Sequence, residues 1–103
     1  MQEYNKLVRD LIPQIVEKEG KRFSFHWASG EELTKRLEDK LQEEVNEYLE
    51  SKELEELADV LEVLVGLASN LGYTEEDLFK KRAEKKQERG GFSEGIVLES
   101  TWE

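Results

Sequence analysis

The chain has 103 residues, of which 37% are apolar and 39% are charged, so it has the size of one small domain whose limited core leaves room for subunit association. Its formal net charge of −10 argues against a general binder of nucleic acid or of anionic membranes, because both repel an acidic surface. A phosphorylated small molecule stays compatible with this charge, since a divalent cation can bridge phosphates to carboxylates.

The absence of cysteine excludes disulfides and thiolate metal sites. The longest apolar-rich stretch, residues 57–71, is interrupted by Asp59 and Glu62 and is shorter than the roughly 20 apolar residues that span a bilayer. No signal peptide is recognisable ahead of the first predicted element. We therefore expect a single domain over residues 1–103, cytoplasmic, with neither a membrane nor a nucleic acid as its partner.

The first predicted element is a short helix over residues 13–19, with Pro13 in its first turn and Gly20 at its end. In residues 22–27 aromatic and polar side chains alternate, which is the period of a strand with one buried face. Residues 96–102 are a second strand candidate. We expect these two segments to pair into a small peripheral β hairpin.

Two long helices form the centre of the chain. Ser29 and Glu32 have the spacing of a capping box, and apolar residues then recur at helical intervals over residues 30–50. A second apolar stripe covers residues 54–71 and ends at Gly72. Both segments are predicted to be helices.

The second of these helices has more apolar surface than one neighbour can cover. Val60, Val63 and Leu67 lie off its main apolar stripe, so two of its faces are apolar. One chain of this length has few elements left to bury both. We expect a second copy to cover one of them, in a homodimer or a homotetramer.

A fourth helix is predicted over residues 78–89, where Thr74 and Asp77 provide a capping arrangement and Gly90 a stop signal. The predicted fold is therefore mainly α: a helical bundle with a small peripheral hairpin, completed by oligomerisation.

Four acidic residues stand out on the two long helices, in two pairs that are each separated by three residues. They are Glu44, Glu47, Glu56 and Asp59. A three-residue spacing puts both members of a pair on one helix face. If the chain reverses near Ser51, Glu44 lies level with Asp59, and the other two acids lie level with each other. Glu44 also takes a seam position where an apolar residue is expected.

Converging carboxylates without histidine or cysteine suit a hard cation, Mg²⁺ or alternatively Mn²⁺. Without the ion, the like charges raise one another's pKa values and push the helices apart, so the metal should stabilise the fold. The chain has 25 acidic residues, and the same spacing recurs among them. An ordinary solvated acidic face is therefore the competing interpretation.

Two segments resemble the paired metal-binding motifs of the all-alpha MazG-type nucleoside triphosphate pyrophosphohydrolases, which are related to the phosphoribosyl-ATP pyrophosphohydrolases of histidine biosynthesis. They are residues 40–47 (KLQEEVNE) and 56–61 (ELADVL). Residues 4–13 (YNKLVRDLIP) and 88–92 (ERGGF) resemble one branch of small stand-alone members. The resemblance implies hydrolysis of a nucleoside triphosphate to the monophosphate and pyrophosphate, with Mg²⁺ held by the four acids, and it suggests a house-cleaning role against abnormal nucleotides.

The resemblance also implies that basic residues after the second motif contact phosphates. Lys85 and Arg89 are the best candidates, with Lys81, Arg82 and Lys86 as alternatives. All of these residues could equally balance neighbouring acids on a solvated helix.

Further roles fall on residues of the N-terminal motif and of the first acidic motif. Lys6 and Arg9 either complete a cationic rim around the triphosphate or anchor the N-terminal segment. Glu43 points about 100 degrees away from Glu44 on the helix, so we expect it to support the site indirectly or to form a salt bridge. Glu47 is the predicted acceptor of the proton of the attacking water. The alternative function is a non-catalytic helical association module whose acidic face binds a cation or a basic partner.

Overall fold

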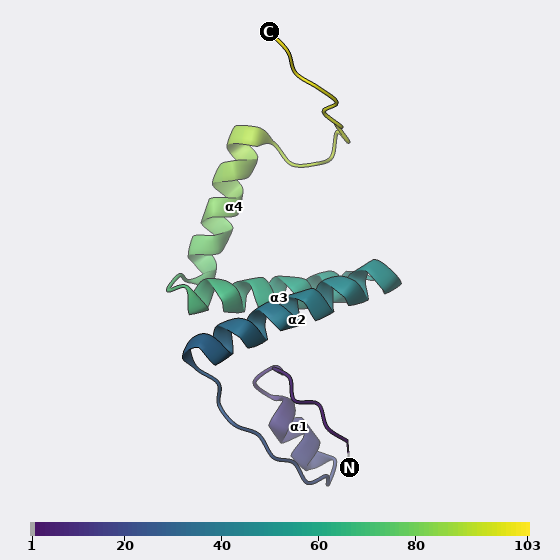
Figure 1. Ribbon diagram of the computed structural model, residues 1–103, viewed down its shortest axis with the longest axis vertical. Coiled ribbons are helices and arrows are strands. Elements are labelled where there is room, and N and C mark those ends of the chain that lie inside the picture. Colours follow the sequence, from purple (N-terminus) through teal and green to yellow (C-terminus); the bar gives the residue numbers. More distant parts are fainter. Residues whose placement is uncertain (1) are drawn as a thin grey trace.

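A computed structural model describes residues 2–103 of the chain (Figure 1). It contains four helices, α1 (Ile12–Lys18), α2 (Gly30–Ser51), α3 (Leu54–Asn70) and α4 (Glu75–Arg89). Within the described residues no strand is formed. The mainly α prediction is confirmed, and each predicted helix is present with its ends displaced by at most three residues.

The pair α2 and α3 is the centre of the molecule. The two helices run antiparallel (Figure 1), because the chain reverses over two residues after Ser51. Lys52 adopts the left-handed conformation there, with φ 60°, and its backbone N–H donates to the carbonyl of Tyr48. The small core of the pair contains Leu37 and Val63, both buried.

A close approach between the two helices fixes their register. A Cβ atom on Gly66 would lie 3.1 Å from Cδ2 of Leu37, so the absence of a side chain lets the helices approach there. One turn further along, Asn70 donates a 2.8 Å hydrogen bond from Nδ2 to Oγ1 of Thr34. Facing residues in this register come from the N-terminal half of α2 and the C-terminal half of α3. The same register therefore brings the C-terminal half of α2 beside the start of α3, where the paired acids lie.

The two predicted capping boxes differ in outcome. At α4, Oγ1 of Thr74 accepts from the backbone N–H of Asp77, and the Asp77 carboxylate accepts from the Thr74 N–H, both at 3.0 Å. The prediction of a capping box at α2 is wrong, because the Ser29 side chain forms no cap hydrogen bond. The Glu32 carboxylate that would complete it is instead bound by Arg36, one turn further along α2.

The chain is extended rather than globular. Its radius of gyration is 18.0 Å, whereas about 13 Å is typical of a compact domain of this length. Figure 1 shows why: α4 leaves the end of α3 and points away from the α2–α3 pair, and α1 lies on the other side of that pair. The helices of one chain therefore do not close into a bundle.

The predicted peripheral hairpin is not formed within the described chain. Residues 22–27 and 96–102 have no regular secondary structure. They lie at opposite ends of the molecule in Figure 1, the first between α1 and α2 and the second beyond α4. Neither can contact the other in this arrangement. None of the helices described is at once long enough and apolar enough to cross a membrane.

Candidate metal centre

The structure brings the four predicted acids together on the α2–α3 pair. Each offers one carboxylate oxygen, and these four oxygens all lie within 4.8 Å of one another. The contributing residues are Glu44, Glu47, Glu56 and Asp59. Two come from the C-terminal half of α2 and two from the first turns of α3, so the antiparallel register creates the cluster.

Glu44 is the member of the cluster that solvent does not reach. Only 6% of the residue is exposed, and its Oε2 atom is buried without any hydrogen-bond partner. Its other oxygen, Oε1, lies 3.3 Å from Nζ of Lys40, one turn earlier on α2. A buried carboxylate oxygen without a partner is costly, since it has lost its water and gained nothing in exchange. A cation in the cluster would satisfy it.

The electrostatics of the cluster agree with that geometry. Burial raises the pKa of the Glu44 carboxyl above its usual value, and the neighbouring Glu47 carboxyl raises it further, while Lys40 acts in the opposite direction. The charged form of Glu44 is therefore disfavoured as long as no cation joins the cluster. Glu47 is exposed and stands at the solvent edge of the group.

The donor set fits Mg²⁺ or Mn²⁺ in chemistry and nearly in size. All four donors are carboxylate oxygens, which hard divalent cations prefer. Two oxygens on one Mg²⁺ are at most about 4.2 Å apart, because each Mg–O distance is about 2.1 Å. The widest separation in the cluster, up to 4.8 Å, exceeds this limit by about 0.6 Å, so the carboxylates would have to move slightly closer to bind one ion.

Basic residues of the N-terminal segment directly contact the acidic patch, by which we mean the four clustered acids together with Glu43. Nζ of Lys6 donates to Oε1 of Glu43 at 2.8 Å, and a guanidinium nitrogen of Arg9 donates to Oδ1 of Asp59 at 2.7 Å. The bond to Lys6 lowers the pKa of the Glu43 carboxyl, and the same bond raises the pKa of Lys6. Glu43 is thus engaged in salt bridges beside the cluster rather than being part of it.

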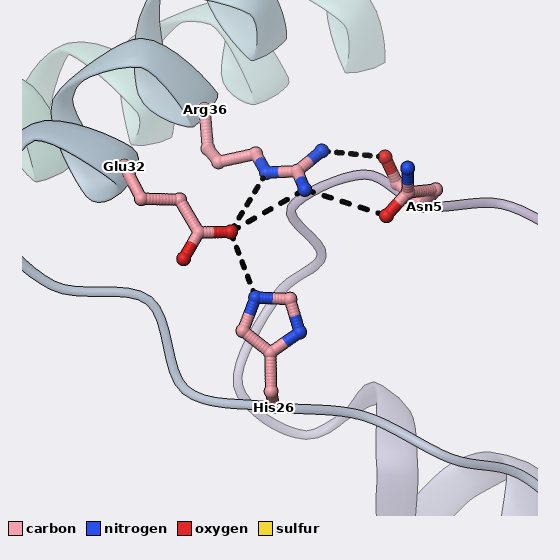
Figure 2. A network of polar contacts seen from close by, with 4 residues as sticks. All are labelled: Asn5, His26, Glu32 and Arg36. Atoms are coloured by element: carbon pink, nitrogen blue, oxygen red, sulfur yellow. Dashed lines mark hydrogen bonds and ion pairs between the residues drawn. The ribbon is translucent and has the colours of Figure 1, made fainter.

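A polar network fixes the N-terminal segment to α2, as Figure 2 shows. Arg36 donates to the backbone carbonyl of Asn5 at 2.7 Å and to its side-chain oxygen at 3.3 Å. The Glu32 carboxylate holds the same guanidinium and bonds Nε2 of His26 at 2.7 Å. Because Asn5 precedes Lys6, the network places the basic residues of this segment next to the acids.

The structure does not bring the predicted phosphate-contacting residues of α4 to the cluster. Lys85 and Arg89 are exposed on a helix that starts from the far end of α3 and points away from it (Figure 1). The acids lie at the opposite end of α3. Within one chain, the basic residues that reach the acidic patch are those of the N-terminal segment and Lys40.

Lys40 is the residue that the sequence interpretation missed. Its side chain is only 17% exposed, and its ammonium group lies 3.5 Å from Glu43 and 3.3 Å from Glu44. The signal was present in the sequence, because a lysine three and four residues before two glutamates faces both on a helix.

Comparison with known proteins adds no relative to this picture: no family model, no curated protein and no solved structure matches the chain. The geometry of the acidic cluster and the motif resemblance are therefore the two grounds on which a function can be inferred.

Proposed function

We propose that the chain is a Mg²⁺-dependent hydrolase that cleaves a nucleoside triphosphate to the monophosphate and pyrophosphate. The observation that carries the proposal is Oε2 of Glu44, a buried oxygen without a partner inside a group of four carboxylates. An ordinary solvated acidic face has no buried member, because each carboxylate there keeps its water. The choice of substrate comes from the resemblance to the MazG-type pyrophosphohydrolases.

In this proposal the four acids hold the metal, and each has a distinct environment. The bound Mg²⁺ would supply a positive charge for the phosphate oxygens and acidify a water molecule for attack on the phosphorus. Glu44, buried in the helix pair, fixes the inner side of the site. Glu47 is exposed, so it can accept the proton of the attacking water and release it to solvent.

The basic N-terminal segment is the proposed phosphate contact. Lys6 and Arg9 are both about half exposed while they bond Glu43 and Asp59, so each can turn towards a phosphate without losing buried contacts. An arginine suits this role because its planar guanidinium binds two phosphate oxygens at once. Lys85 and Arg89 could reach a cluster only from another copy, in the homo-oligomer that we also propose.

The test is a nucleotide panel incubated with the protein and MgCl₂, with the products separated by anion-exchange chromatography. The panel contains standard, deoxy, deaminated and oxidised nucleoside triphosphates. We expect equal amounts of monophosphate and pyrophosphate from at least one substrate, and no activity in EDTA. Release of inorganic phosphate with a diphosphate as co-product would contradict the proposed cleavage position.

Matched variants connect that activity to the cluster. Asp59→Asn and Glu44→Gln keep side-chain size but remove one negative donor each, and we expect both to lower turnover by at least about a hundredfold. Glu50→Gln is the control, since Glu50 is an exposed acid of α2 outside the cluster. Equal loss in all three variants would reject the assigned site. If the wild-type protein hydrolyses no nucleotide of the panel, the alternative function as an association module would be favoured instead.

A further inference from the structure

Two segments without regular secondary structure each expose several large aromatic or aliphatic side chains. In the C-terminal segment, the apolar side chains of residues 96–98 and of Trp102 are between 77% and 85% exposed. In residues 22–28, Trp27 is 86% exposed and Phe25 is 55% exposed. Apolar side chains exposed to this extent in a row mark a contact surface rather than a random scatter.

The segment at residues 22–27 has one aromatic and one polar side. Phe23, Phe25 and Trp27 occupy alternate positions, and they already contact one another: the rings of the first two lie 6.1 Å apart and those of the last two 5.0 Å apart. The positions between them carry Arg22, Ser24 and His26. Alternation of this kind gives a strand one apolar face and one polar face.

The C-terminal segment has the complementary alternation. Ile96, Leu98 and Trp102 fall on one parity with Ser100, and Val97, Glu99 and Thr101 fall on the other. If the two segments paired as neighbouring strands, the three larger apolar side chains of the first set would share one face of the ribbon with the aromatic rings.

Charge complementarity links the other faces of the two segments. No basic residue follows Arg89, whereas the segment from residue 90 to the end carries three glutamates. On the polar side of residues 22–27 lies Arg22, beside Ser24 and His26, and the segment contains no acid, whereas residues 96–102 contain Glu99 and no basic residue. Paired strands could therefore bring Glu99 and Arg22 together on their polar face, and such opposite-charge pairs stabilise neighbouring strands.

The two segments cannot meet within one chain in this fold. α4 has 15 residues and so carries the chain about 22 Å from its start, at 1.5 Å per residue. It does so away from the α2–α3 pair, while residues 22–27 lie on the other side of that pair (Figure 1). The large radius of gyration has the same origin, because both ends of the molecule project from the central helices.

We propose that residues 96–102 of one copy pair as a β-strand with residues 22–27 of a second copy. The exchange is reciprocal, so the two copies form a two-fold dimer that contains two such pairings. Each pairing joins an aromatic face to an apolar one, and the opposite face contains Arg22 of one copy and Glu99 of the other. This interface goes beyond the proposed hydrolase function and does not depend on it.

Disulfide trapping tests the interface cleanly, because the chain contains no cysteine. Ser24→Cys in a chain with an enlarged tag is co-expressed with an untagged chain that carries Val97→Cys, Glu99→Cys or Thr101→Cys. The three tail positions share one parity and cover different registers, since a disulfide forms only when the two Cα atoms are about 4.4–6.8 Å apart. We expect a disulfide-linked heterodimer on non-reducing gels with at least one of the three.

Leu98→Cys is the matched control, because its side chain lies on the opposite face of the same strand and should give much less of the Ser24→Cys heterodimer. The same cysteines placed together in one chain distinguish the alternatives. A disulfide confined to one chain, with no heterodimer from the mixed chains, would overturn the proposal. Equal trapping at all four tail positions would also overturn it, since random collisions of a flexible tail would not distinguish the two faces of a strand.

Native mass provides the second measurement. The wild-type chain should have at least twice the 12.1 kDa of one chain by light scattering. Leu98→Asp puts a charge on the paired apolar face, and we expect its mass to fall to that of one chain while the far-ultraviolet helix signal persists. The preserved signal separates loss of the interface from loss of folding. A wild-type protein with the mass of one chain would refute the dimer.

Discussion

Replacing Glu44 by glutamine should stabilise the metal-free protein and remove its response to magnesium. Glu44 is buried, its pKa is raised first by that burial, and one of its oxygens has no partner. Glutamine has nearly the same size and keeps an oxygen for Lys40, but it carries no charge. The variant therefore relieves the repulsion in the cluster and leaves a poorer metal site, so the two effects have opposite signs.

Coulomb's law gives the scale of the repulsion. Two unit charges 4.8 Å apart repel by about 3.5 kcal/mol at an effective dielectric constant of about 20. Lys40, at 3.3 Å from Glu44, attracts the Glu44 carboxylate by about 5 kcal/mol at the same dielectric constant. Three neighbouring carboxylates outweigh Lys40 even though Arg9 partly neutralises Asp59 and solvent weakens the outer charges. We expect a net gain of about 1–2 kcal/mol, and each kcal/mol raises Tm by about 4–8 °C in a domain of this size.

Urea unfolding followed by circular dichroism, in EDTA and in MgCl₂, measures both effects. The wild-type protein should gain stability from Mg²⁺, since the ion binds the folded cluster and not the unfolded chain, whereas Glu44→Gln should gain little. Glu43→Gln is the control, because Glu43 bonds Lys6 beside the cluster and keeps the four donors intact. A glutamine variant at position 44 that is less stable in EDTA, or equally responsive to Mg²⁺, would refute the reasoning.

The pH dependence gives the same prediction an independent readout. A carboxyl whose folded-state pKa is raised binds more protons in the folded state, so it destabilises the fold at neutral pH and ceases to do so as the pH falls. In EDTA, the stability gap between Glu44→Gln and the wild type should therefore be widest above the raised pKa of Glu44. It should close as the pH falls towards the ordinary value of 4.5. A gap that stays constant over this range would show that its cause is not the charge.

Three further predictions follow from single contacts. Arg9→Ala removes the exposed ion pair with Asp59. It should tighten Mn²⁺ binding by up to about fivefold, because such pairs contribute at most about 1 kcal/mol, and it should lower turnover. Isothermal titration measures the binding, and the nucleotide assay measures the turnover. Thr74→Ala loses a capping box and should cost about 1 kcal/mol in urea unfolding, whereas Ser29→Ala, at a helix start without a side-chain cap, should cost only a few tenths. Gly66→Val drives a branched side chain into the helix interface and should cost about 1–3 kcal/mol, measured in the same way; an unchanged urea midpoint would contradict the close approach to Leu37.

The acidic cluster was predictable because it depends on few variables. A three-residue spacing fixes which acids share a helix face, and a two-residue connection favours antiparallel packing of neighbouring helices. The facing of Glu44 and Asp59 then follows from the numbering alone. The burial of Glu44 was indicated by its seam position, and the structure leaves its Oε2 without a partner. That these residues bind a metal stays a prediction.

The features that sequence reasoning did not predict depend on competing partners or on distance. Ser29 lacks its expected cap because the Glu32 carboxylate is taken by Arg36 and His26, and a local pattern does not say which partner prevails. The direction of α4 is set by the short connection over residues 71–74, which carries no periodicity. The predicted strands at residues 22–27 and 96–102 are not formed in the chain, because this direction of α4 keeps the two segments apart. Their pairing between two copies stays a proposal.

The charges at the site connect the proposed catalysis to the proposed assembly. Five carboxylates and three basic side chains lie within the acidic patch, namely the four cluster acids with Glu43, and Lys6, Arg9 and Lys40. Their formal charge is −2, which one Mg²⁺ balances. A nucleoside triphosphate brings several further negative charges, so additional cations must come with the substrate or from elsewhere in the protein. Helix α4 carries six basic residues that one chain holds away from its own cluster. The proposed two-fold exchange at the end of α4 would bring these basic residues, which share the helix with five acids, close to a second copy. An isolated chain does not provide that approach.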